Sequence, residues 1–201
     1  MSSNVDLVKL FSSVAETMVE NQSSLNKADE YNQDHGDHMV DIFKMITGAV
    51  QEAPKNDLAK GLAKASKVLT EKPSGSADMY SKGLAQAAEY FQEGQSLDAT
   101  QLLPLLQTML GGGEASVSKG AGGLLNSLAG SLGGEDGLDL GDILSAGAAF
   151  MQSKEEGHSN LEAAIDAVIS GSKMGETPHR AQSSKLVADV LLQTLMSNLG
   201  Q

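Results

Sequence analysis

Apolar residues recur three or four positions apart along almost the whole chain, so that stretch after stretch has one apolar face at helical spacing. These stretches lie at residues 7–18, 39–50, 58–69, 80–91, 102–109, 124–132, 140–151, 161–168 and 187–195. No run of alternating β-branched and polar residues, the pattern of a half-buried strand, competes with them. The sequence therefore predicts an all-α protein.

The spacing of the apolar stretches also indicates how they are arranged. Short polar or glycine-containing loops join them, which favours antiparallel neighbours around one core. Pro54, Pro73 and Pro178 fall between stretches, and Pro104 lies early in its own stretch, where a missing N–H donor costs least. Three glycines at 111–113 mark a break, but neither half carries a linker. The prediction is a single helical domain over residues 1–201.

The charge balance excludes several classes of partner. The chain has 14 Lys and Arg against 26 Asp and Glu, a formal net charge of −12. Such a protein lacks the basic face that binds nucleic acid or an anionic membrane surface. It has no cysteine for disulfides or thiolate metal sites, and its first residues resemble no secretion signal. No apolar run is long enough to span a bilayer, so we expect a cytoplasmic protein.

Polar residues concentrate at positions 29–39, between the first two apolar stretches. The segment contains Asp29, Asp34 and Asp37, with His35 and His38 beside them. Crowded carboxylates repel one another, and a hard cation with oxygen ligands relieves the repulsion. Mg²⁺ is the default ion, because a few carboxylates and the phosphates of a ligand complete its octahedron.

Two other interpretations of this segment stay open. The aspartates could cap the helix that follows and favour its positive end. The two imidazoles could hold a transition metal together with the aspartates. An EF-hand is excluded, because its D-x-D-x-D-G ladder and the glutamate at its twelfth position are absent.

The acidic segment resembles the nucleotide-binding (L) subunit, or phosphatase-type domain, of the dihydroxyacetone kinase family, whose pattern runs D-x-x-x-G-D-G-D-H-G-x-N-M. Asp29 and Asp34 are five positions apart, as in the family, whereas Asp37 follows Asp34 after three positions rather than two. The resemblance implies that Asp29, Asp34 and Asp37 hold one or two Mg²⁺ ions, which bridge the phosphates of ADP or ATP. It also implies that His38 lies beside this nucleotide.

A second segment resembles the same family. Ser74, Gly75 and Ser76 correspond to its G-G-x-S-G loop, which opens a helix and grips the phosphates. A Gly/Ser loop at a helix N-terminus offers N–H groups and hydroxyls to an anion, although Ser-Gly-Ser alone is also an ordinary helix cap. Asp78 follows closely and would repel a phosphate unless a cation lies between them.

Two other family segments are altered. Residues 120–128 lack the Asp and Thr of the G-D-x-T-M-x-D-x-L segment that helps to enclose the nucleotide. Residues 177–185 run straight into the last helix, so a nucleotide-closing loop is shortened or absent. Arg180 in this stretch either keeps a positive charge near the site or is a solvated arginine at a helix start.

The resemblance implies a closed antiparallel barrel or bundle of about eight helices. It implies a Mg²⁺-dependent, ADP/ATP-binding phosphotransferase subunit that acts with a separate triose-binding kinase subunit, and no residue is assigned a catalytic role. The alternative is a non-catalytic metal- or ligand-binding regulatory protein on the same fold, and a third reading is a helical scaffold. Formation of a homodimer stays open.

Overall fold

The computed structural model describes residues 6–55, 57–91, 102–110, 166, 169–170 and 174–199. Within these residues there is no strand, and the helices are α1 (Leu7–Ala28), α2 (His35–Gln51), α3 (Leu58–Leu69), α4 (Gly75–Tyr90), α5 (Leu102–Leu110) and α10 (Pro178–Leu199). The prediction of an all-α protein is confirmed for this part of the chain. The apolar stretches at 124–132 and 140–151, most of 161–168, and the altered segment at 120–128 lie outside the described residues.

Polar residues fix where several helices begin. The Asp6 carboxylate accepts hydrogen bonds from the backbone N–H groups of Val8 and Lys9 and so caps α1. Asp57 caps α3 in the same way through Lys60 N–H. Asp34 and Ser74 occupy the corresponding positions before α2 and α4, but neither side chain makes a cap hydrogen bond.

The N-terminus of α2 is capped from a neighbouring helix instead. Asn26 near the end of α1 accepts hydrogen bonds through Oδ1 from Gly36 N–H at 2.6 Å and from Asp37 N–H at 3.2 Å. Its Nδ2 donates to the Asp37 carboxylate, as does Nε2 of Gln22. A Cβ on Gly36 would overlap the Gln22 carbonyl oxygen, so glycine is required for this close approach of α1 and α2.

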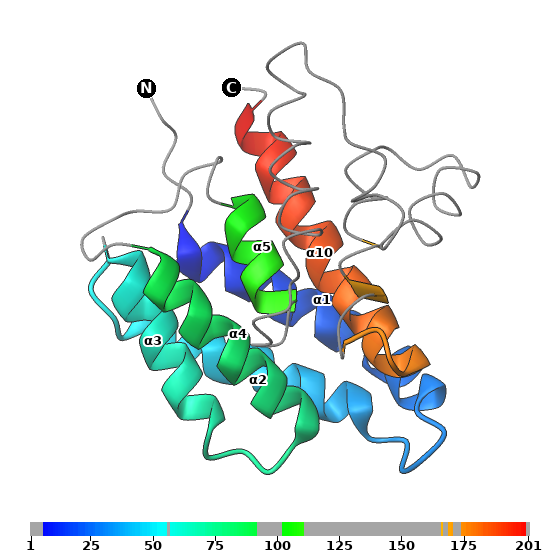
Figure 1. The fold of residues 1–201 in the computed structure, drawn as a ribbon. Helices are drawn as coiled ribbons and strands as arrows, with labels where there is room; N and C mark the ends of the chain where they lie inside the picture. The colour runs from blue at the N-terminus through cyan, green and yellow to red at the C-terminus, as the bar shows by residue number, and fades with distance from the viewer. Residues whose placement is uncertain are drawn as a thin grey trace, which may run out of the picture.

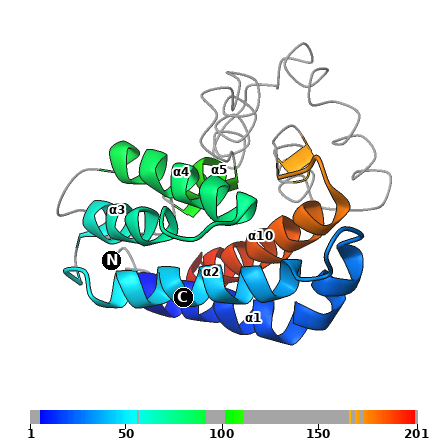
Figure 2. The same ribbon diagram turned by 90° about the horizontal axis from the view of Figure 1, so that it is seen from below.

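Contacts between helices run round the described part of the fold. Each of the first four helices packs against the next, α5 contacts α10, and α10 packs along α1. Figure 1 shows α10 lying near both α5 and α1. In the turned view of Figure 2, α3 and α4 lie on one side of the molecule and α1 and α2 on the other. None of these helices combines the length and apolarity needed to cross a bilayer.

The buried core follows the predicted apolar stretches. The largest fully buried side chains come from α1, α2, α3 and α4, namely Leu10, Phe11, Met18, Leu25, Met39, Ile42, Phe43, Ile46, Leu62, Leu69, Tyr80 and Leu84. Phe43 and Tyr80 meet edge to face, with ring centroids 5.2 Å apart, which ties α2 to α4. The cavity described next lies where α2, α4 and α10 begin.

Candidate functional site

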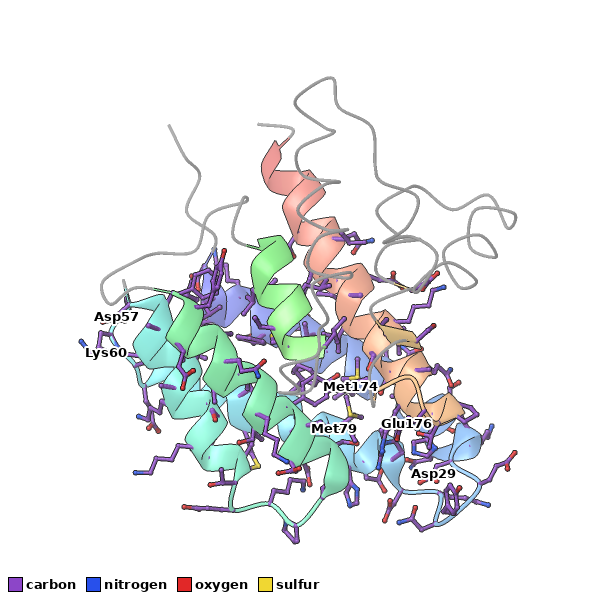
Figure 3. The ribbon with its side chains drawn as sticks, viewed as in Figure 1. Asp29, Asp57, Lys60, Met79, Met174 and Glu176 are labelled. Carbon is purple, nitrogen blue, oxygen red and sulfur yellow. The ribbon has the colours of Figure 1, made fainter. Side chains whose placement is uncertain are left out.

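A cavity of about 480 Å³ lies where α2, α4 and α10 begin. Its walls come from three separate parts of the chain, with lining residues between positions 29 and 38, at 73–76 and at 177–180. Figure 3 labels Asp29, in the loop after α1, and Glu176, in the segment that leads into α10. Backbone N–H groups in the first turn of a helix lack helical partners and carry the positive end of its dipole. Two of these N–H groups in α2 already bond Asn26, so the anion is favoured mainly by the positive dipole ends of the three helices that begin at this cavity.

Arg180 adds a positive side chain to this cavity. Its guanidinium lies against the start of α4, where a Cβ on Gly75 would be 3.0 Å from Arg180 Nη2. The Nε atom is buried and has no hydrogen-bond partner in the protein. A buried donor of this kind is costly when it lacks an acceptor. An anionic ligand in the cavity would offer acceptor oxygens to this guanidinium.

Asp29 contributes a buried negative charge. The residue is only 4% exposed, and its Oδ1 accepts a hydrogen bond from Tyr31 N–H at 3.1 Å. His179 Nδ1 lies 3.7 Å from the same oxygen. Burial by itself would raise the pKa of Asp29, but the Tyr31 hydrogen bond and the neighbouring His179 outweigh it and lower this pKa below its ordinary value. Asp29 is therefore an ionised carboxylate on the cavity wall at neutral pH.

Asp34 lies at the rim of the same cavity. Its side chain is partly exposed, and its Oδ1 is 3.6 Å from His38 Nδ1, one turn further along α2. Because Asp34 makes no cap hydrogen bond, the capping interpretation of the acidic segment does not hold for this residue. Its carboxylate oxygens are accessible to a ligand or cation that enters the cavity.

Asp37 is placed differently from the other two aspartates. It does not line the cavity, and its carboxylate accepts the hydrogen bonds from Gln22 and Asn26. Those two hydrogen bonds lower the pKa of Asp37. The structure thus brings Asp29 and Asp34 together at the cavity and gives Asp37 a role in joining α1 to α2. Among the described residues, no group of three or more His, Asp or Glu side chains is positioned to hold a metal ion.

The remaining predicted residues line the cavity as well. Ser74, Gly75 and Ser76 line the cavity at the start of α4, and His38 lines it from α2. Asp78 is in the first turn of α4 but outside the lining, with its carboxylate 2.7 Å from Lys82 Nζ. Lys82 therefore neutralises the charge that would otherwise repel a phosphate.

Sequence reasoning missed a buried histidine pair, His35 and His179, in the wall of the cavity. His35 and His179 have ring centroids 4.6 Å apart, and Thr177 Oγ1 lies 3.2 Å from His179 Nε2. His35 Nε2 is 3.0 Å from Ser183 Oγ. Since that hydroxyl donates to the Arg180 carbonyl, His35 is the donor to Ser183. The Pro-His-Arg sequence at 178–180 indicates that a helix begins with a histidine and an arginine. It does not indicate that His35 lies beside them.

His35 makes the stability of the fold depend on pH. Burial, followed by the neighbouring His179, lowers the pKa of His35 from 6.5 to about 4. Between these pH values the unfolded chain binds the proton and the folded chain does not, so acidification destabilises the fold. We expect the free energy of unfolding to fall by about 3 kcal/mol from this residue as pH drops across the range. Urea denaturation at several pH values measures this slope.

The matching variant is His35→Gln, which keeps a donor for Ser183 but cannot titrate. It should lose stability less steeply between pH 6.5 and pH 4 than the wild-type protein. His38→Gln controls for the removal of an imidazole at the same end of α2. Identical slopes for the wild type and His35→Gln would contradict the assignment of the effect to His35.

The cavity therefore combines groups of both signs. Arg180 and three helix starts favour an anion, while Asp29 and Asp34 favour a cation that lies with it. A phosphate ligand with a bound divalent cation matches both. Comparison with protein-family models, curated proteins and solved structures found no match for this chain.

Proposed function

We propose that the cavity binds the phosphates of ADP or ATP together with Mg²⁺. The observation that supports this function is the meeting of three distant segments at one cavity. Asp29 and Asp34 come from the loop before α2, Ser74–Ser76 from the start of α4, and Arg180 from the first turn of α10. These are the residue types that a metal-bridged phosphate requires, namely carboxylates for the cation and N–H donors and a guanidinium for the anion.

Each group has a separate role in this proposal. Ser74, Gly75 and Ser76 offer backbone N–H groups and hydroxyls to phosphate oxygens, and Arg180 neutralises their charge. Asp29 and Asp34 hold the cation, with His38 beside them. Mg²⁺ commonly uses one or two carboxylates and completes its coordination with substrate phosphates and water. When bound, the ion neutralises phosphate charge and orients the phosphates; nucleotide and ion should therefore bind together.

By its likeness to the dihydroxyacetone kinase L subunit, the chain is proposed to be a phosphotransferase subunit in the cytoplasm. By the same likeness, a separate triose-binding subunit would hold the acceptor. The proposed fold is a closed antiparallel barrel of about eight helices. The contacts that run from α1 round to α10 and back to α1 support a closed arrangement.

A second candidate is a regulatory protein that binds the same ligand without phosphoryl transfer. The direct run of Thr177 into α10, which begins at Pro178, favours it, because a nucleotide-closing loop has no room there. Turnover with a triose-binding kinase subunit separates the two candidates. Release of triose phosphate supports the kinase subunit, and stoichiometric binding without turnover supports the regulatory protein.

Isothermal titration of the full chain with ADP and with ATP, each with and without Mg²⁺, tests the binding itself. Saturable binding that requires Mg²⁺ is expected. Absence of heat and of any thermal shift with either nucleotide at millimolar concentration would contradict the proposed function.

Two isosteric variants test which aspartates hold the cation. Asp34→Asn should weaken Mg²⁺-dependent ATP binding about tenfold or more, because a cavity carboxylate loses its charge. Its melting temperature should change little, since Asp34 caps no N–H group. Asp37→Asn is the matched control and should bind nearly as the wild type does, because Asp37 lies outside the cavity lining. Equal losses in the two variants would contradict the assignment from the cavity.

A further inference from the structure

Tyr31 is the most exposed aromatic side chain among the residues that the structure describes. It is 84% exposed, while Phe11, Phe43 and Tyr80 are fully buried. A single exposed aromatic ring on a protein surface is ordinary. This one, however, also lines the cavity proposed to hold phosphates. It is therefore a large apolar surface that a bound ligand could cover.

The position of Tyr31 is set by contacts with the cavity wall. Its N–H donates to the buried Asp29 carboxylate, so the backbone at this point is tied to the wall. Its ring stands nearly perpendicular to His179, at 85°, with centroids 6.3 Å apart. Two residues later Gln33 adopts a left-handed backbone conformation, with φ of 59°, which turns the chain toward α2. The ring is thus attached to the wall at one side while most of it faces solvent.

We propose that Tyr31 is the platform on which the base of a bound nucleotide stacks. This inference rests on the proposed function, because it requires the phosphates to lie in the cavity. With the phosphates beside Arg180 and Ser74–Ser76, the rest of a nucleotide extends toward the rim, where Tyr31 stands. Stacking covers the exposed ring, and every base has a face that can take part. The preferred ligand is then a nucleotide rather than a sugar phosphate or an inorganic phosphate.

The choice of base follows from the same geometry. Stacking depends on the area of the base rather than on hydrogen bonds to its edges. Purine nucleotides should therefore bind more tightly than pyrimidine nucleotides, and this preference should depend on the Tyr31 ring.

Titration of the full chain with Mg²⁺ and either tripolyphosphate or ATP tests the platform, because the two ligands share phosphates and differ in the nucleoside. Tyr31→Ala should lower ATP affinity about tenfold and leave tripolyphosphate affinity unchanged. Tyr31→Phe should keep the wild-type affinity for both ligands. Tyr90→Ala is the matched control, because Tyr90 is 63% exposed but does not line the cavity. Titration with CTP in place of ATP measures the purine preference. ATP should bind more tightly than CTP to the wild type, and this difference should shrink in Tyr31→Ala.

Each outcome distinguishes this inference from the function on which it rests. Equal loss of ATP and tripolyphosphate affinity in Tyr31→Ala would overturn the platform and indicate a role in shaping the cavity wall. No loss of either would overturn it as well, while the phosphate proposal would stand. If the wild type binds neither ligand, the phosphate proposal and the platform both fail.

Discussion

Replacing Gly36 by alanine is expected to destabilise the folded protein by about 3 kcal/mol. The added Cβ would overlap the Gln22 carbonyl oxygen and lie 2.7 Å from Asn26 Oδ1. The first of these is a backbone atom of α1, so a rotamer change cannot relieve the overlap. The second accepts the hydrogen bonds that cap α2, so the cap would be displaced as well. Urea denaturation followed by far-UV circular dichroism measures the loss.

Gly48→Ala is the matched control for this prediction, because it makes the same substitution in the same helix. A Cβ on Gly48 would have no neighbour within 4 Å. Alanine is the better helix former, so this variant should gain roughly 0.5–1 kcal/mol. Similar changes in stability for both variants would show that α1 and α2 do not approach closely at Gly36.

Replacing Arg180 by glutamine is expected to lower the affinity for Mg²⁺ and ATP about 100-fold. Charge-assisted hydrogen bonds from a guanidinium to phosphate oxygens are strong, and glutamine keeps neither the charge nor the paired donors. Arg180→Lys should recover only part of the affinity, because an ammonium group cannot form the paired hydrogen bonds of a guanidinium. Isothermal titration gives the affinities, and a thermal melt checks that each variant is folded.

Lys185→Gln removes the same charge from the same helix and serves as the control. Lys185 does not line the cavity, and its Nζ lies 3.4 Å from the Asp166 carboxylate. Its substitution should change ATP affinity only slightly. A comparable loss in Lys185→Gln would assign the effect of Arg180 to general charge rather than to contact with the ligand.

Much of the fold could be predicted from local pattern because helix formation is read from neighbours three and four positions apart. The buried faces of α1 and α2 coincide with the apolar stretches, as Phe11 and Ile42 illustrate. The start of α3 also has a local cause, the Asp57 cap. The order of helix contacts is not local, since nothing in the spacing of α10 shows that it packs against both α1 and α5.

The candidate site likewise has a part that local sequence predicts and a part that depends on tertiary packing. The aspartate and Ser-Gly-Ser segments are short motifs that can be found in the sequence. Besides Asp29 and Asp34, four residues predicted from them line the cavity, namely His38, Ser74, Gly75 and Ser76. Asp37 could not be separated from Asp34 by spacing alone. One precedes α2 and the other lies within its first turn, on the side that meets Gln22 and Asn26. His179 could not be paired with His35 at all, because tertiary packing alone brings them together.

The hydrogen bond between His35 and Ser183 spans 148 positions of the chain. The contacts between Asn26, Gly36 and Asp37, by contrast, close within a single helical hairpin. Closure of a short loop costs less entropy than closure of a long one, so the hairpin can form before α10 docks on it. The cavity is then complete only when the start of α10 has docked beside the hairpin of α1 and α2. A ligand that contacts both Asp34 and Arg180 would bind only when α10 is docked on the hairpin. Such a ligand would therefore shift the population from the undocked to the docked state.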